Sequence, residues 1–386
     1  MLVMEYASRR RSPVCAVRGM PATGIRRGAA RGPELQKQPR KAARRKGMAV
    51  TLDEVAALAK VSPMTVSRVV NGHGKVRETT RERVMRAVRE LGYTPNLAAS
   101  ALATAQDTRV AMIYTNPSNA YLRELLAGAL RGATRTAAQL VIDTWDNLGP
   151  SAQRQAAAAL AKRVAGVILP PPLCESKALV SEFIEAEVPV VAIASGRFHH
   201  DISCVRIDDY RASREITAHL IAAGHRRIGY IKGNPNQTAS TRRYEGFQAA
   251  LAGAGIELDP SLVESGFFTY RSGLEATEKL LAHPQPPTAI CAANDDMAAA
   301  AVSVAHRRGL DVPRDLSIVG FDDTSAATTV WPELTTIRQP ISAMADSAVD
   351  ILLRNIRRKD KSTRTVVDHV VPHELIERDS VAPPAR

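Results

Sequence analysis

Aromatic side chains are scarce in this sequence. Of its 386 residues, 4% are Phe, Trp or Tyr, whereas 45% are hydrophobic. A folded core must therefore consist mainly of Val, Leu, Ile and Ala. With 24% charged residues the composition is that of a globular protein, and the length predicts two or three domains.

Cysteine is also rare, and its spacing excludes two classes of site. The four cysteines lie far apart and form no C-x-x-C pair: Cys15, Cys174, Cys204 and Cys291. Neither a zinc site nor a disulfide framework is predicted. Isolated buried thiols in a reducing, cytoplasmic compartment are the simplest interpretation.

Metal-binding, catalytic and membrane signals are missing as well. The histidines His199, His200, His369 and His373 lack metal-ligand spacing, and the pair Asp295–Asp296 is better suited to capping a helix. No G-x-S-x-G, H-E-x-x-H or GxxxxGK[ST] motif occurs, so we predict neither an enzyme nor a cofactor. No run of 18 apolar residues occurs, so no membrane-spanning helix is expected.

What the sequence does have is positive charge, and most of it lies at one end. The formal net charge is +13, but residues 1–47 alone carry 13 basic and 2 acidic residues. This leader is rich in Arg, Gly, Pro and Ala, is predicted to be disordered, and lacks the apolar stretch of a secretory signal. It could hold DNA phosphates, it could be a targeting peptide, or translation could start at Met48, which we favour.

Residues 48–94 predict three short helices. Thr51 and Glu54 have the spacing of a capping box, and apolar residues follow at helical spacing. The stretch VSPMTVSRVVNG, residues 61–72, places Ser62 as a cap before Pro63 and alternates valines with polar side chains. A third helix is expected over 78–91, ended by Gly92. This is a helix-turn-helix module.

A short linker helix at 95–106 is predicted to be unstable alone, and the chain after it alternates between strands and helices. Unbroken apolar runs predict strands at 109–114, 139–143, 165–169, 188–193, 203–207, 226–231, 287–292 and 315–320. Helical periods lie between most of them, at 119–138, 151–164, 208–223, 240–253, 270–282 and 294–309. We expect an α/β module of two doubly wound parallel-sheet subdomains over 107–380, with a ligand crevice at the carboxyl ends of the strands. The boundaries that we assign are 107–207 plus 337–366 for the N-subdomain and 208–336 plus 367–380 for the C-subdomain.

The ordered motifs resemble a known family. TLDEVAALAKVSPMTVSRVVNGHGKV, AGHRRIGYIKG, RRYEGFQAAL, AANDDMAAAAV, PRDLSIVGFDDT and LTTIRQP follow one another through residues 48–380. Together they resemble the LacI/GalR repressors, whose effector module also resembles periplasmic sugar-binding proteins. The resemblance implies a DNA-binding head followed by an effector-binding, dimerising module.

The resemblance also implies which residues touch DNA. The second helix is expected in the major groove, with Pro63 and Met64 at the family's operator-discriminating positions. Met64 can contact a thymine methyl and Arg68 can bind guanine. The remaining residues that the resemblance assigns to DNA are Thr51, Leu52, Ser62, Thr65, Ser67, Asn71 and Asn96, several of them suited to phosphates.

The linker carries the last implied DNA contact, and the chain departs from the family's pattern at three positions. Leu102 matches a leucine that wedges into the central base step of the minor groove. Ser100 stands where many members have Arg. Lys60 replaces a common glycine in the turn, and Arg77 replaces the usual Ser or Thr cap of the third helix.

An effector site follows from the same resemblance. Arg243 looks like the family's ligand arginine and Asp322 like its acceptor partner across the cleft, while Asn294 offers a donor and an acceptor. Phe268 resembles the aromatic platform under a sugar ring. Tyr121 and Asn116 would close the other side of the site.

The predicted function is that of a sequence-specific DNA-binding transcriptional regulator. We expect a repressor of carbohydrate-utilisation genes that binds a near-palindromic operator as a homodimer and responds allosterically to a small sugar-like effector. One alternative keeps the DNA binding but replaces the sugar by a protein or a phosphometabolite corepressor. Another is a solute-binding protein, which would need a signal peptide and would not need residues 48–104.

Overall fold

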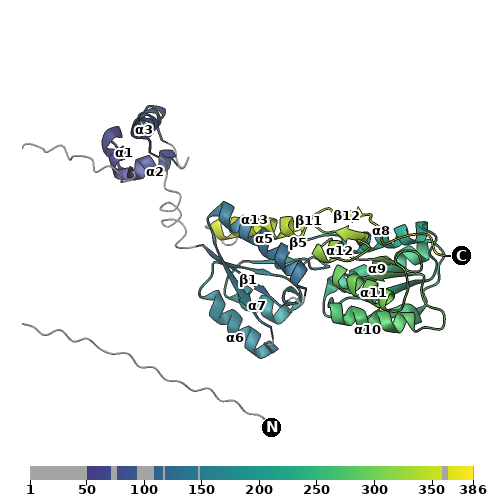
Figure 1. Cartoon of the computed structure of the whole chain (residues 1–386). Helices are drawn as coiled ribbons and strands as arrows, with labels where there is room; N and C mark the ends of the chain where they lie inside the picture. Colours follow the sequence, from purple (N-terminus) through teal and green to yellow (C-terminus); the bar gives the residue numbers. More distant parts are fainter. Residues whose placement is uncertain are drawn as a thin grey trace, which may run out of the picture. The chain divides into compact units, whose positions relative to one another are not determined.

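The computed structural model describes residues 50–70, 76–93, 108–115, 118–146, 148–358 and 364–385. The chain forms two compact units, Met1–Thr94 and Pro95–Arg386 (Figure 1). The predicted DNA contacts Asn71, Asn96 and Leu102, and the predicted effector contact Asn116, lie outside the described residues.

The first unit is the predicted three-helix head. Its helices are α1 (Leu52–Ala59), α2 (Pro63–Val70) and α3 (Glu78–Leu91). Val55, Val66 and Val84 are fully buried in a small shared core, so each helix contributes part of its apolar face. The head is thus held together by aliphatic side chains, as the lack of aromatic residues requires.

The ends of the head helices follow their local sequence. The Thr51 amide donates to Glu54 Oε2 at 2.8 Å and the Glu54 amide donates to Thr51 Oγ1 at 3.4 Å, which forms the predicted capping box. Gly92 ends α3 with φ 61°, and Lys60 ends α1 with φ 51°. That left-handed backbone favours glycine, which explains why a glycine is expected at position 60. Arg77 precedes α3 without a side-chain capping bond.

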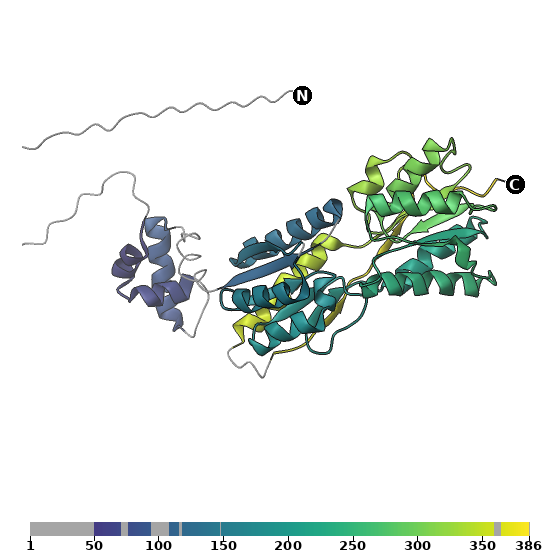
Figure 2. The same ribbon diagram turned by 90° about the horizontal axis from the view of Figure 1, so that it is seen from below.

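The second unit consists of two lobes, each a parallel sheet covered by helices (Figure 2). The N-lobe sheet has six strands in the order β11-β5-β4-β3-β1-β2, and the C-lobe sheet has four in the order β7-β6-β8-β9. All pairs in both sheets are parallel. This confirms the doubly wound architecture predicted from the apolar runs.

The elements of the N-lobe alternate along the chain. They are β1 (Arg109–Tyr114), α5 (Asn119–Thr136), β2 (Gln139–Thr144), α6 (Pro150–Ala161), β3 (Gly166–Leu169), the 3-10 helix η1 (Leu173–Glu175), α7 (Lys177–Glu185), β4 (Val190–Ile193), β5 (Ser203–Arg206), α13 (Ile341–Arg357) and β11 (Asp368–Val370). Helix α13 lies against α5 so closely that a Cβ at Gly128 would be 2.0 Å from the Ser342 carbonyl oxygen. Only glycine allows this approach of the two helices.

The C-lobe follows the same alternation. Its elements are α8 (Asp209–Ala222), β6 (Ile228–Lys232), α9 (Thr238–Gly253), the 3-10 helix η2 (Pro260–Leu262), β7 (Val263–Ser265), α10 (Tyr270–Leu281), β8 (Ala289–Ala292), α11 (Asp295–Arg307), β9 (Ser317–Val319) and α12 (Ser325–Thr329). A separate antiparallel pair, β10 (Thr336–Arg338) and β12 (Glu374–Ile376), is formed by segments that pass between the lobes. The yellow parts of the chain in Figure 2 show this passage.

One predicted boundary is wrong. We assigned residues 367–380 to the C-subdomain, but Asp368, His369 and Val370 pair with Cys204, Val205 and Arg206 at the edge of the N-lobe sheet. The last crossing between the lobes therefore follows Val370. The three residues of β11 are all exposed, so no apolar run marks them as a strand.

Candidate functional site

The second helix of the head presents one face to its neighbours and one to solvent. Val66 and Val69 are buried, whereas Ser62, Pro63 and Arg68 are exposed and the Met64 side chain is 64% exposed. Met64 and Arg68 are four residues apart and so share a face of the helix. Because the Met64 thioether and the Arg68 guanidinium are both exposed, they contribute little to the core of the head and are suited to contact base edges.

The predicted DNA contacts of the first two helices differ in whether the fold already engages their side chains. Ser62 Oγ accepts a hydrogen bond from the Thr65 amide at 3.2 Å and lies 2.9 Å from Thr65 Oγ1, so it caps the helix. The Thr51 side chain is likewise engaged by its capping box. Leu52 is half-buried against the core of the head. Arg68 has no hydrogen-bond or ionic partner within the described residues, so its guanidinium is available to bind DNA.

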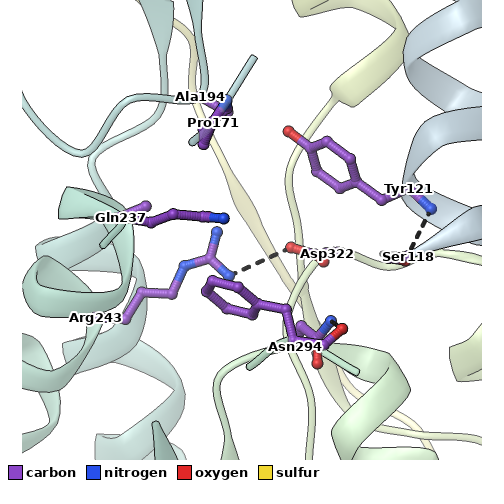
Figure 3. Close-up of a pocket in the computed structure, with 10 residues that line it drawn as sticks. Ser118, Tyr121, Pro171, Ala194, Gln237, Arg243, Asn294 and Asp322 are labelled. Carbon is purple, nitrogen blue, oxygen red and sulfur yellow. Dashed lines mark hydrogen bonds and ion pairs between the residues drawn. The ribbon is translucent and has the colours of Figure 1, made fainter. Parts of the chain in front are cut away.

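A cavity lies between the two lobes of the second unit. It is lined by Ser118, Tyr121, Pro171 and Ala194 from the N-lobe and by Gln237, Ala239, Arg243, Phe268, Asn294 and Asp322 from the C-lobe (Figure 3). Most of these residues follow the carboxyl end of a parallel strand, where open α/β sheets bind ligands. The structure thus brings together five of the six residues that we predicted for the effector site.

Arg243 is the centre of the cavity's polar wall. This side chain is buried, and its Nε donates to Asp209 Oδ1 at 2.8 Å. Its Nη1 donates to the Ala293 carbonyl at 2.6 Å and lies 3.5 Å from Asp322 Oδ1. Its Nη2 has no partner among the described residues, so the guanidinium is fixed in place with one nitrogen available to a ligand.

Asp322 supplies the acceptor beside that nitrogen. Gln339 Nε2 donates to Asp322 Oδ1 at 2.5 Å, and Arg243 approaches the same oxygen, which leaves Oδ2 for a ligand. Burial raises the pKa of this carboxyl to about 7, against the opposing effects of Arg243 and Gln339. Asp322 has φ 117°, a backbone conformation that residues other than glycine rarely adopt.

Positive φ angles occur at three of the residues that line the cavity. Besides Asp322, the lining residues Ala194 and Phe268 have φ 55° and φ 60°. Each such residue costs on the order of 1–3 kcal/mol, and such costs gather at ligand sites. The Phe268 ring fits only because position 233 is glycine, where a Cβ would be 2.0 Å from the ring. The centroid of this ring lies 5.7 Å from the Arg243 Cζ.

Asn294 lines the cavity, but its side chain also makes two hydrogen bonds within the C-lobe. Its Oδ1 accepts from the Met297 amide at 3.0 Å, and its Nδ2 donates to the Phe268 carbonyl at 3.1 Å. Asn294 is therefore the N-cap of α11, a role that we had assigned to Asp295 and Asp296. Asp295 is instead buried and accepts from the side chain of Thr336 and from the amide of Thr324.

Gln237 is a residue of the site that the sequence did not identify. Its side chain is buried at the cavity and has no hydrogen-bond partner within the described residues. Figure 3 shows this amide beside the Arg243 guanidinium, with the Tyr121 hydroxyl on the opposite wall. Gln237 stands in a polar loop immediately before α9, and no local pattern distinguishes it from the loop's other residues.

The raised pKa of Asp322 leads to a prediction about pH. The pKa of Asp322 in the folded protein, about 7, is above the ordinary aspartate value of 3.8, so its contribution to stability is complete below about pH 4 and is lost as pH rises through 7. Asp322→Asn removes the titrating group, so its urea midpoint should rise relative to that of the native chain between about pH 5 and about pH 8. If the urea midpoints of the two proteins instead changed with pH in parallel, Asp322 would be ionised throughout this range and the prediction would be wrong.

Comparisons with known proteins agree with this geometry. Residues 51–96 match the model of bacterial regulatory proteins of the lacI family, and residues 217–381 match that of a periplasmic binding protein-like domain. The chain is 34% identical over 338 residues to the HTH-type transcriptional regulator DegA of Bacillus subtilis (strain 168), and the match spans 87% of this chain and 99% of DegA. The chain belongs to the LacI family of bacterial regulatory proteins.

Solved structures of LacI-family proteins share the fold of both units. A transcriptional regulator CelR–cellobiose complex is 33% identical, with a TM-score of 0.66 over 86% of this chain and 99% of CelR. The lac repressor dimer bound to operator and an anti-inducer is 28% identical, with a TM-score of 0.63 over 87% of this chain and all of that one. This LacI-family chain is accordingly a DNA-binding transcriptional regulator and not an enzyme.

Two further observations describe this LacI-family member. No helix in the described ranges combines the length and the apolar character that a bilayer span requires. The described residues also contain no group of three or more His, Cys, Asp or Glu side chains placed to hold a metal ion. LacI-family regulators bind operator DNA and small-molecule effectors, typically as dimers.

Proposed function

We propose that this protein is a cytoplasmic homodimeric repressor of carbohydrate-utilisation genes. Its affinity for a near-palindromic operator is set by a neutral sugar or sugar derivative bound between the lobes. Met64 and Arg68 contact base edges, and the Ser67 and Thr65 hydroxyls contact phosphates. Thr51, Leu52 and Ser62 contact DNA as well as serving the fold of the head, and Asn71, Asn96 and Leu102 complete the DNA contacts.

The observation that carries the sugar assignment is the charge balance of the cavity. Arg243 is the one cationic side chain among the described residues that line the cavity, and it is already paired with Asp209 and close to Asp322. A phosphate or carboxylate would find no uncompensated positive charge and would meet the Asp322 carboxyl. Vicinal hydroxyls, by contrast, can accept from Arg243 Nη2 and donate to Asp322 Oδ2 at once.

The shape and lining of the cavity support the same ligand. Tyr121 and Gln237 offer further hydrogen bonds from opposite walls, while Pro171, Ala194 and Phe268 provide apolar surface for a ring face. The similarity to a CelR–cellobiose complex adds support from a relative that is in complex with a saccharide.

Calorimetry on the full chain tests this proposal with matched ligands. The panel comprises glucose, galactose, ribose, maltose and cellobiose, with glucose 6-phosphate as the charged partner of glucose. We expect one neutral saccharide to bind, and we expect phosphorylation to weaken binding by at least ten-fold, because a buried unpaired anion costs several kcal/mol. Tighter binding of the phosphate ester would favour the phosphometabolite alternative, and no binding of any saccharide would overturn the sugar assignment.

A further inference from the structure

We propose that Glu175 is a positioning residue: from the N-lobe it caps helix α9 of the C-lobe, and so it holds the cleft closed and sets effector affinity without touching the effector. Glu175 ends η1, which follows β3, and it is not among the residues that line the cavity. Thr238 is the first residue of α9, the helix that carries Ala239 and Arg243 into the cavity wall.

The contacts of Glu175 cross from one lobe to the other. Its Oε1 accepts from Thr238 Oγ1 at 2.6 Å and from the Thr238 amide at 3.2 Å. Ser195, after β4 in the N-lobe, donates its hydroxyl to the same oxygen at 3.3 Å. Thr238 Oγ1 in turn accepts from the amide of Gly196 at 3.0 Å. We call Glu175, Ser195, Gly196 and Thr238 the interlobe latch.

Helix α9 needs this acceptor because its own sequence does not supply one. Its N-cap residue, Gln237, makes no side-chain capping bond. The free amides at the start of a helix are stabilised by an acceptor, and the helix dipole favours a negative charge there. The carboxylate of Glu175 meets both needs, but it does so only while the two lobes are in contact.

The packing around the latch shows how closely the lobes approach. A Cβ at Gly196 would lie 2.4 Å from the Ala239 amide nitrogen, so the two backbones touch at this point. Ser195 is fully buried, and His199 Nε2 lies 3.0 Å from its hydroxyl. Glu175 Oε2 is buried without a hydrogen-bond partner in the described part of the chain, and the Nε atom of Arg197 lies 3.9 Å from it.

The latch therefore biases the lobes towards the closed arrangement before any ligand arrives. A ligand that needs contacts from both lobes binds more tightly when more of the protein is already closed. A hydrogen bond to a charged group contributes enough to shift such an equilibrium on the order of ten-fold. This consequence for affinity rests on the proposed function, whereas the latch itself does not.

Hydrogen exchange on the full chain tests the latch without a ligand. The variants are Thr238→Val, which removes the hydroxyl but keeps the shape, Thr238→Ser, which keeps the hydroxyl, and Glu175→Ala. We expect amides 195–197 and 238–240 to exchange at least ten-fold faster in Thr238→Val and Glu175→Ala, with Thr238→Ser close to the native chain. Amides of β1 and β8 should keep their protection in all variants, which verifies the fold.

Two exchange results would overturn the latch. In the first, amides 195–197 and 238–240 exchange in Thr238→Val and Glu175→Ala at the rate of the native chain. In the second, exchange is accelerated as much in Thr238→Ser as in Thr238→Val, which would show that the hydroxyl is not the cause.

Calorimetry with cellobiose then separates the latch from the proposed function. Weaker binding by about ten-fold in Thr238→Val supports the coupling, and unchanged binding refutes it. If cellobiose fails to bind the native chain, that result counts against this ligand alone, and the exchange result still decides the latch.

Discussion

Arg68→Ala should weaken operator binding by at least ten-fold. Arg68 is exposed on the face of α2 that also carries Met64, and a bidentate contact from arginine to guanine contributes about 1–3 kcal/mol of discrimination. Pro63 and Met64 have almost no hydrogen-bonding capacity, so we expect Arg68 to supply most of the base-specific polar contact from this helix. The effect should be largest on the preferred sequence and smaller on unrelated DNA.

The experiment needs a DNA ligand and a control arginine. A duplex selected from a random library by the full chain serves as operator, and fluorescence anisotropy measures affinity at a fixed salt concentration. Arg271→Ala is the matched control, because this arginine is 89% exposed on α10 of the C-lobe. A uniform loss on all DNA would make Arg68 a phosphate contact, and no loss at all would remove it from the interface.

Arg243→Ala should abolish effector binding and also destabilise the second unit by about 3–5 kcal/mol. Asp209 and Asp322 are buried beside the guanidinium, and its removal leaves both carboxyls without their cation. The same substitution removes Nη2, the donor that we propose for the ligand. The two effects have one cause, so both should appear in the same variant.

A neighbouring arginine provides the control for this prediction. Arg242 is half-exposed; it pairs with Glu245 on the surface of α9 and its Cζ lies 5.0 Å from the centroid of the Tyr210 ring. Both contacts are exposed to solvent, so Arg242→Ala should lower the free energy of unfolding by no more than about 1 kcal/mol. The double variant Arg243→Met with Asp209→Asn should recover part of the stability but none of the ligand binding. If Arg243→Ala binds the effector as tightly as the native chain, Arg243 has no role in the site.

Much of the fold could be predicted because local patterns mark it. The buried strands β1, β3, β4 and β8 are unbroken apolar runs, and the capping box at Thr51 and the glycine at position 92 mark helix ends. The strands β10, β11 and β12 have three residues each and follow no such pattern. They form by pairing with strands that are distant in sequence: β10 pairs with β12, and β11 pairs with β5.

The site residues that lie in sequence motifs could be predicted, and those outside motifs could not. Arg243 and Asp322 stand in recognisable stretches, RRYEGF and GFDD, whereas Gln237 and Ala194 stand in loops without a pattern. Glu175 and Thr238 are 63 residues apart and belong to different lobes. Their contact depends on how the two sheets face each other, and no periodicity in a single sequence encodes that arrangement.

The central claim is that a saccharide in the interlobe cavity controls DNA binding by the head. It is tested most directly by measuring operator affinity with and without the saccharide that binds in calorimetry, and saccharide affinity with and without operator. The two affinities should change by the same factor, typically about 5- to 150-fold, because linkage between two sites is reciprocal. Operator affinity that stays constant at saturating saccharide would contradict the account.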